Sequence, residues 1–169
     1  MAKLWKAGRG KLGFMQPLLG SWAAEANSEM GPLRCTRKFE RTLNGSYIRL
    51  HARWSFGAKI EAPCGESSPK KVGPYQEFAL IGVGADGKVG FWSFTSDGKQ
   101  SQGTLADATD LHPEAIGFEA RMPAGHARMV YWPDPEGGFS WVVESKTQKG
   151  WRRFVEHHYR PVDDAPVAS

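Results

Sequence analysis

The chain has 169 residues, of which 40% are hydrophobic and 24% charged, so general disorder is excluded and one domain with a sizeable core is expected. The formal net charge of +4 arises from 22 basic and 18 acidic residues that are mixed along the chain. This balance is typical of an ordinary solvated surface and indicates neither a nucleic acid nor a membrane as partner. With 20 glycines and 12% aromatic residues, the composition favours many short strands joined by tight turns.

The first 17 residues are expected to form a segment of their own ahead of the strands. Residues 12–19, "LGFMQPLL", are mostly apolar but contain Pro17, which predicts a short helical turn that plugs one end of the fold. The basic residues of this segment are not followed by the apolar run that an export signal needs. We therefore expect a cytoplasmic protein with reduced thiols, while a bridge between Cys35 and Cys64 stays open at this stage.

Turn signals divide the rest of the chain into short strand-like segments. Asn44-Gly45, Asp86-Gly87 and Asp97-Gly98 tolerate positive φ and are typical of β-hairpins. No apolar pattern supports a helix longer than two turns. The predicted strands are residues 19–28, 34–43, 46–56, 75–85, 88–96, 100–108, 115–122, 127–132, 139–147 and 151–160.

These strands belong to a single predicted domain that spans residues 18–161. The proline-containing stretch 57–73 is expected to be the longest loop, a candidate rim or lid. The tail 162–169 is expected to be flexible.

Residues 46–56, "SYIRLHARWSF", alternate between apolar and polar side chains, as a strand with two different faces does. The alternation favours an inward apolar face. If the polar face pointed inward instead, it would offer cationic donors to an anionic group such as a carboxylate. The polar face carries Tyr47, Arg49, His51 and Arg53, and the apolar face carries Ile48, Leu50, Ala52, Trp54 and Phe56.

Ten meandering strands with an apolar face bury it by closing into a barrel, which also removes the unpaired edges. Such a barrel is wide enough to hold a small ligand, and Phe91, Phe139 and Trp141 are expected to line the cavity beside the apolar face of residues 46–56. Strands 75–85 and 139–147 are apolar on both faces. We therefore expect an outer cover, either the N-terminal segment or a second subunit.

Three short motifs follow one another along these strands. They are Gly20-Ser21-Trp22 in the first strand, Leu43-Asn44-Gly45-Ser46-Tyr47 at a hairpin, and a final strand pair centred on Trp141 and Trp151. Together they resemble the calycin superfamily and, within it, bacterial lipocalin-like domains of unknown function. The resemblance covers nearly the whole chain and implies an all-β, single antiparallel barrel of about ten strands.

The resemblance also implies roles for individual residues. Gly20 and Trp22 would form the closed end of the barrel, and Arg160 of the last strand would stack on the Trp22 ring. The distantly similar nitrobindins hold haem through a histidine near the C-terminus, a place that His157 and His158 occupy here. A strand directs these two neighbouring rings to opposite faces, so one of them is expected to face the cavity.

We expect a noncatalytic protein that binds a small, largely apolar ligand inside the barrel without a cofactor or a metal. The chain lacks the serine nucleophile elbow and the zinc motif H-E-x-x-H. Residues 82–87 match G-x-G-x-x-G, but a strand follows them where a dinucleotide site needs a helix. One alternative is a haem-binding or isomerase/cyclase-type enzyme that uses His157 or His158. Another is a homodimeric interaction module without a ligand.

Overall fold

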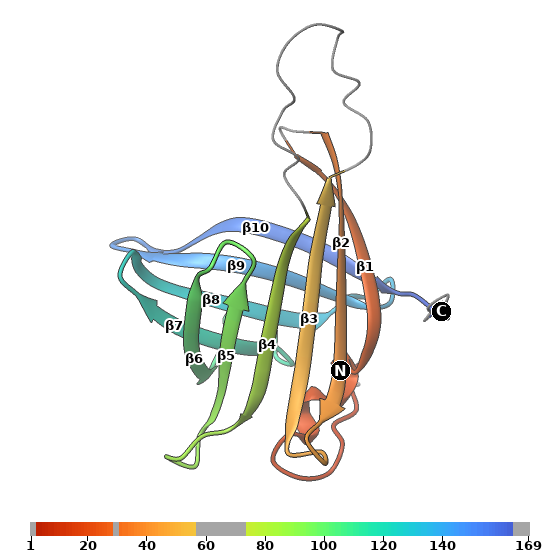
Figure 1. Cartoon of the computed structure of the whole chain (residues 1–169), viewed down its shortest axis with the longest axis vertical. Helices are drawn as coiled ribbons and strands as arrows, with labels where there is room; N and C mark the ends of the chain where they lie inside the picture. The colour runs from red at the N-terminus through yellow and green to blue at the C-terminus, as the bar shows by residue number, and fades with distance from the viewer. Residues whose placement is uncertain (1–2, 29–30, 57–73, 164–169) are drawn as a thin grey trace, which may run out of the picture.

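The computed structural model describes residues 3–28, 31–56 and 74–163, in which the chain forms a closed antiparallel β-barrel (Figure 1). Each strand pairs with its neighbours in sequence, and β1 pairs with β10 to close the wall. The predicted all-β class is confirmed. The strands are β1 (Gly20–Ser28), β2 (Gly31–Thr42), β3 (Tyr47–Phe56), β4 (Tyr75–Val83), β5 (Val89–Thr95), β6 (Gln100–Ala106), β7 (Ile116–Met122), β8 (Gly125–Pro133), β9 (Phe139–Thr147) and β10 (Gly150–Pro161).

The ends of these strands differ from the predicted ones by a few residues only, because the predicted turn dipeptides do lie between strands. Asn44 and Gly45 both have positive φ, 57° and 79°, between β2 and β3. In the other two dipeptides the glycine alone takes the left-handed conformation, with φ of 78° at Gly87 and 82° at Gly98. Glycine carries no Cβ and adopts this conformation at little cost.

The apolar face of β3 points into the barrel. Leu50 and Ala52 are buried, whereas Arg49 and His51 are exposed on the outer surface. The outward direction of the polar face follows from the two-residue period of a strand, because an apolar set seeks the core.

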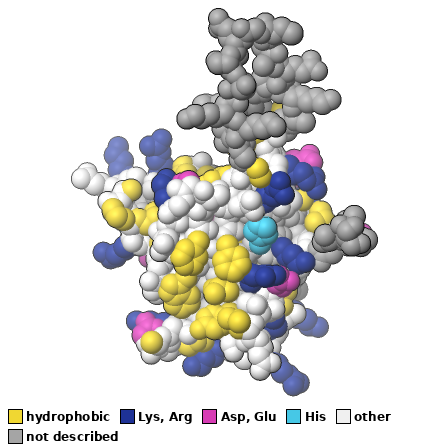
Figure 2. Space-filling view, viewed as in Figure 1, with side chains coloured by type: hydrophobic (Ala, Val, Ile, Leu, Met, Phe, Trp, Pro, Cys, Tyr) yellow, Lys and Arg dark blue, Asp and Glu magenta, His cyan; other side chains and the backbone are white. Residues whose placement is uncertain are grey.

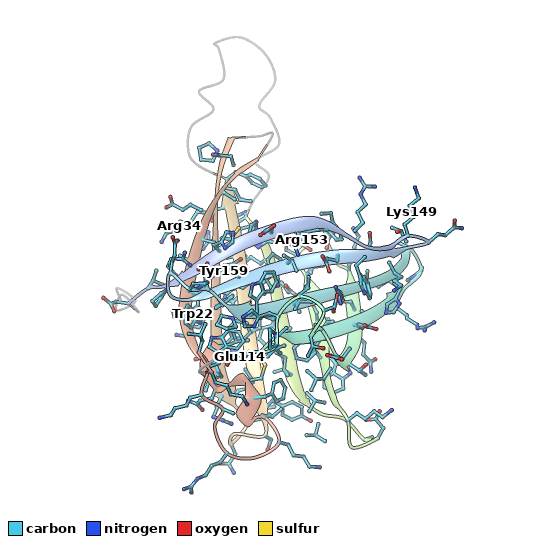
Figure 3. The ribbon with its side chains drawn as sticks, turned by 180° about the vertical axis from the view of Figure 1, so that it is seen from behind. Trp22, Arg34, Glu114, Lys149, Arg153 and Tyr159 are labelled. Atoms are coloured by element: carbon cyan, nitrogen blue, oxygen red, sulfur yellow. The ribbon has the colours of Figure 1, made fainter. Side chains whose placement is uncertain are left out.

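The predicted helical turn is present as η1 (Gly13–Leu18), a 3-10 helix at the end of the barrel where β1 begins (Figure 1). Its Met15 and Leu18 side chains are fully buried. The Trp22 indole N–H donates to the Leu18 carbonyl at 2.8 Å, and the Trp22 ring meets Phe139 edge-on with centroids 4.9 Å apart. Figure 3 shows Trp22 and Tyr159 on the neighbouring strands β1 and β10 beside this cluster. Together these side chains fill the closed end.

Residues 107–115, which connect β6 and β7, cover the outer side of β8 and β9. A small apolar cluster forms there, in which Ala108 packs with Val130 and Val142. The Arg128 guanidinium holds the connection in place, because it donates to both Asp110 carboxylate oxygens at 2.8 and 2.7 Å and to Glu144 at 2.8 Å. This connection therefore supplies an outer cover to strand 139–147, where the sequence had suggested the N-terminal segment or a second subunit.

Several sequence predictions fall on residues outside the described ranges. These are the loop 57–73 with Cys64 and most of the tail 162–169. Within the described residues Cys35 is a free, buried thiol. No helix in the described parts of the chain is long and apolar enough to cross a membrane.

Candidate functional site

A cavity of about 200 Å³ opens into the barrel at the end opposite η1. Tyr75, Thr95 and Met122 stand at its rim, because each lies at the end of its strand that is remote from the closed end. Aromatic and aliphatic side chains make up most of its wall, which is the usual character of a small-molecule site. The apolar lining residues include Trp54, Phe91, Phe118, Met129, Trp141 and Val143.

Two aromatic pairs stand on the cavity wall. Trp54 and Tyr75, from β3 and β4, have ring centroids 5.3 Å apart. Phe91 of β5 meets Phe118 of β7 edge-on at 5.6 Å. Since Gly103 of β6 lies between these two strands and carries no side chain, the Phe91 ring can lie across it; a Cβ there would meet Phe91 and the Glu119 backbone. The arrangement offers flat apolar surfaces to a guest.

Glu77 and Arg128 are the charged residues that line this cavity. The Arg128 guanidinium is bonded to Asp110 and Glu144, whereas the Glu77 carboxylate lies on the inward face. Alternation in β4 sets Glu77 on the same inward face as Ala79 and Ile81. The buried Ser93 hydroxyl donates to its Oε1 at 2.6 Å, and this is the hydrogen bond found for the carboxylate within the described residues. A carboxylate has about four acceptor positions, so Glu77 retains capacity for a further donor.

Arg37 of β2 is the second charged group in the interior, and it is only 1% exposed. Its guanidinium donates to the Tyr131 hydroxyl at 2.9 Å and to the Tyr159 hydroxyl at 3.2 Å. It also lies over the ring of Trp141, 4.0 Å from the centroid. Because Trp141 lines the cavity and Arg37 does not, the indole separates the cation from the cavity.

Arg37 and Glu77 influence each other across the interior without touching. No ion pair within 4 Å joins them among the described residues, and Nη2 of Arg37 has no hydrogen-bond partner there. Burial by itself would lower the pKa of Arg37, but Tyr131, Tyr159 and Glu77 offset this and raise the pKa above its ordinary value. The guanidinium therefore stays charged.

The other titratable groups near Arg37 are held neutral. Burial raises the pKa of the Cys35 thiol to about 11, although Arg37 opposes the shift. Burial also lowers the pKa of His157 to about 4, and Arg37 and His158 add to this effect. Burial raises the pKa of Tyr159 to about 12. At neutral pH neither a thiolate nor an imidazolium is available in the interior.

The residues predicted to bind a ligand, His157 aside, lie in three different places. Trp54, Phe91 and Trp141 line the cavity. Leu50 and Phe139 are buried in the core, and Phe56 packs against that core half-buried. Arg49 and His51 lie on the outer face, as does His158, whose Nδ1 is 3.0 Å from the Ser140 hydroxyl.

His157 is the one of the two adjacent histidines that points inward. Its ring packs against Trp54 and Trp141, with centroids 5.8 and 5.3 Å away, and its Nδ1 lies 3.3 Å from the Tyr159 hydroxyl. These contacts occupy the space beside the ring, so the arrangement does not fit a haem bound to His157. No group of three or more potential metal-ligating side chains occurs in the described part of the chain.

Arg160 does not stack on Trp22, contrary to the expectation drawn from the resemblance; no cation–π contact between them is found in the described residues. The Arg160 guanidinium instead turns to the β8–β9 loop, where it donates to Asp134 at 3.1 Å and to the Gly137 carbonyl at 2.7 Å. Carboxylate and carbonyl acceptors on this loop satisfy the guanidinium better than a ring face does. Phe139 takes the place beside Trp22.

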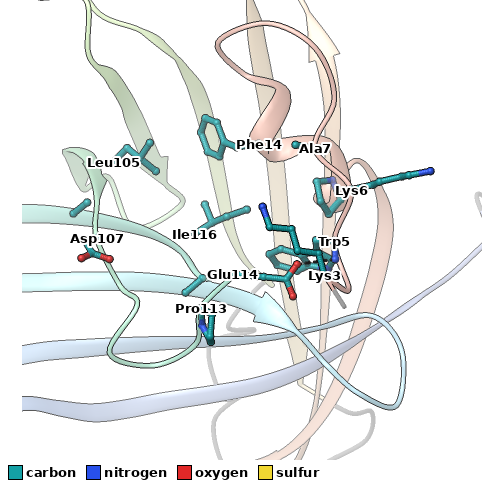
Figure 4. Close-up of a pocket in the computed structure, with 13 residues that line it drawn as sticks. Lys3, Trp5, Lys6, Ala7, Phe14, Leu105, Asp107, Pro113, Glu114 and Ile116 are labelled. Carbon is teal, nitrogen blue, oxygen red and sulfur yellow. Dashed lines mark hydrogen bonds between the residues drawn. The ribbon is translucent and has the colours of Figure 1, made fainter. Parts of the chain in front are cut away.

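A second, larger cavity of about 850 Å³ lies outside the barrel, between the N-terminal segment and the β6–β7 connection (Figure 4). Trp5, Phe14 and Ile116 contribute apolar surface to it. Of its two carboxylates, Asp107 and Glu114, the latter already accepts hydrogen bonds from the backbone N–H groups of Leu4 and Trp5 at 3.0 and 2.9 Å. The N-terminal segment forms one side of this groove, and Glu114 fixes the backbone of that segment.

An apolar patch lies on the outer face of β4 and β5, where Figure 2 shows hydrophobic side chains beside a histidine. Phe78 and Phe94 are direct cross-strand neighbours and are 41% and 47% exposed. Leu80 and Trp92 form the next outward pair. This is the surface that a homodimeric interaction module would use.

Sequence reasoning missed the interior charges. Alternation in β2 sets Arg37 on the face of Cys35 and Phe39, and alternation in β4 sets Glu77 on the face of Ala79. A single charged residue within an otherwise buried strand face was the signal that could have identified both.

No family model and no curated protein matches the chain. Among solved structures, the chain is similar to a de novo designed fluorescence-activating β-barrel, with 14% sequence identity and a TM-score of 0.37. The similarity covers 87% of this chain and 95% of that chain.

Proposed function

We propose that the protein binds a small, largely apolar ligand inside its barrel and performs no chemistry on it. The observation that carries the proposal is the cavity of about 200 Å³ with its aromatic wall. An apolar protein cavity of about 150 Å³ holds a benzene molecule, so this space suits a single-ring aromatic compound. Affinity would come chiefly from the apolar area removed from water.

The groups that could perform chemistry support the noncatalytic part of the proposal. Cys35 is buried with a pKa of about 11, so its thiolate is scarce. His157 is neutral at physiological pH and its ring is enclosed by Trp54 and Trp141. A haem-dependent alternative predicts a Soret band that disappears in the His157→Gln variant, whereas a binder without cofactor has no such band.

The experiment is a titration with toluene, followed by thermal unfolding. A ligand that binds the folded state alone raises the melting temperature, and the rise grows with ligand concentration. We expect this rise in the natural protein and its loss in Ala120→Leu, because Ala120 lines the cavity and a leucine fills part of it. The matched control is Ala7→Leu, which changes the outer groove instead and should keep the response.

Two results would contradict the proposal. In the first, toluene has no effect on the natural protein at concentrations near its solubility. In the second, the response survives Ala120→Leu but is lost in Ala7→Leu, which would assign binding to the groove outside the barrel.

A further inference from the structure

The two interior charges are not equally accessible to a ligand. Glu77 lines the cavity, whereas Arg37 is sealed behind Trp141 and bonded to two phenol hydroxyls. Arg128 also lines the cavity, but its guanidinium is bonded to Asp110 and Glu144. The charged group that a molecule in the cavity can bind is therefore the Glu77 carboxylate. This is the opposite of the cationic donor set that the polar face of β3 would have supplied from the inside.

The carboxylate also has unused acceptor capacity. Ser93 donates to one of its oxygens at 2.6 Å, and no further hydrogen bond to Glu77 is found among the described residues. A buried or half-buried acceptor gains most from a donor that reaches it in a dry site, since bonds to ionised acceptors are about twice as strong as neutral ones. A ligand with an O–H or N–H group can supply such a donor.

The charge balance of the interior argues for an uncharged ligand. Among the described residues, the cation Arg37 and the anion Glu77 lie on the inner side of the wall, and they interact through the low-dielectric interior. A carboxylate guest would add a second anion beside Glu77, and an ammonium guest would be an additional cation in a site already balanced by Arg37. The carboxylate would lose its hydration beside a like charge. The ammonium would lose its hydration for an ion pair with Glu77, whose charge Arg37 already offsets in part, and such desolvation outweighs the gain.

The shape of the cavity argues for a single ring. The Trp54–Tyr75 pair and the Phe91–Phe118 pair both belong to its wall, and aromatic rings favour edge-on or offset contacts with other rings. A guest ring between these pairs can direct one substituent to β4, the strand that carries Glu77.

We infer that the ligand is an uncharged single-ring aromatic compound whose O–H or N–H group donates a hydrogen bond to the Glu77 carboxylate. The inference rests on the proposed function, because it concerns the same cavity. It adds that phenol-like and aniline-like compounds are preferred over toluene, and that aromatic acids are rejected.

The test measures dissociation constants of toluene, phenol, aniline, benzoate and benzylamine by chemical-shift titration at pH 7. Phenol and toluene have nearly the same shape, so their ratio isolates the donor group. We expect phenol and aniline to bind about tenfold more tightly than toluene, the usual effect of one hydrogen bond to a charged group. Benzoate and the benzylammonium ion are expected to bind more weakly than phenol.

The variants assign this preference to Glu77. In Glu77→Met the phenol-to-toluene ratio should fall to about one, and in Glu77→Gln it should fall partially while benzoate gains affinity. Glu119→Gln, which changes a carboxylate of the outer face that is bound to His126 at 2.9 Å, should leave the ratio unchanged. Because each ratio is taken within one protein, partial unfolding of a variant cancels; if Glu77→Met does not fold, the Glu77→Gln ratio decides.

The outcomes separate this inference from the proposed function. Equal binding of phenol and toluene, or tightest binding of benzoate or benzylammonium, overturns the inference and leaves the barrel as an apolar binding site. A preference for phenol that persists in Glu77→Met and Glu77→Gln also overturns it. Absence of binding by every compound removes the proposed function and the inference together.

Discussion

The guanidinium of Arg37 lies over the Trp141 ring, 4.0 Å from its centroid, so one indole separates a buried cation from the cavity. The same guanidinium bonds to Tyr131 of β8 and Tyr159 of β10. It therefore links β2 to strands that follow it by about ninety residues or more, beside the ring contacts that Phe39 of β2 makes with Tyr131 and Phe139. We call Arg37 with its contacts to Trp141, Tyr131 and Tyr159 a brace, because these contacts hold the Trp141 ring in the cavity wall.

Replacement of Arg37 tests this brace. Arg37→Ala removes two hydrogen bonds to buried phenols, leaves a void and leaves Glu77 without its counter-charge. Loss of one partner from such a buried charged network costs about 3 kcal/mol or more. Urea unfolding measures the change. Arg53→Ala, on the exposed face of β3, serves as control and should stay within about 0.5 kcal/mol of the natural protein; equal effects of the two changes would refute the brace.

His157 predicts a specific pH dependence of stability. Burial lowers the pKa of this imidazole from its ordinary value of 6.5 to about 4 in the folded protein. Since the unfolded chain binds the proton more readily, the stabilising effect of neutral His157 is present above pH 6.5 and is lost as the pH falls toward 4.

The measurement is the free energy of unfolding from about pH 7 to about pH 4.5 in the natural protein and in His157→Gln. We expect the decline over this range to be shallower in the variant, by at most about one proton. His51→Gln, which changes an exposed histidine of β3, should keep the natural slope. Parallel curves for the natural protein and His157→Gln would show that His157 is not held neutral by burial.

The β8–β9 turn offers a matched pair of glycines. Gly137 and Gly138 both have positive φ, 99° and 74°. A Cβ on Gly137 meets open space, whereas a Cβ on Gly138 would collide with the carbonyl oxygen of Tyr159. Gly137→Ala should cost about 1 kcal/mol through backbone strain. Gly138→Ala should cost clearly more, about 3 kcal/mol, because the β10 backbone must also shift. Thermal unfolding of both variants checks the order, and a reversed order would contradict this turn geometry.

Cys35 is predicted to be unreactive in the folded protein. With a pKa of about 11, only about one thiol in a thousand is ionised at pH 8, and the side chain is fully buried. In a Cys64→Ser variant, where Cys35 is the remaining thiol of the two, iodoacetamide should modify the protein in urea but not without it. Rapid modification of the native variant, detected by mass spectrometry, would place Cys35 in contact with solvent.

Local patterns in the sequence were sufficient to predict the strands. Asn44-Gly45 marks the β2–β3 turn because both residues tolerate positive φ, and the alternation of residues 46–56 decides which side of β3 is buried. Such signals involve neighbours in sequence, and they led directly to the all-β meander. They also located Trp54 and Trp141, because large aromatic residues on an inward face are expected at the cavity.

The polar part of the site could not be predicted in the same way. The pairing of Glu77 with Ser93 depends on the register of β4 against β5, and the contacts of Arg37 with Tyr131 and Tyr159 depend on how the wall closes. These relationships connect residues far apart in the chain, and a single sequence carries no record of them. The predicted contact of Arg160 with Trp22 was wrong for a related reason. The acceptors of Arg160, Asp134 and Gly137, lie on the β8–β9 loop, and the sequence of β10 does not indicate that this loop is near.

The most direct test of ligand binding in the barrel uses the indole N–H signals of the seven tryptophans during a phenol titration. Trp54 and Trp141 line the cavity, Trp5 lines the outer groove, and Trp92 lies on the outer face of β5. Binding in the barrel predicts saturable shifts at Trp54 and Trp141 while Trp5 and Trp92 stay in place. Saturable shifts at Trp5 or Trp92, with Trp54 and Trp141 unmoved, would contradict it.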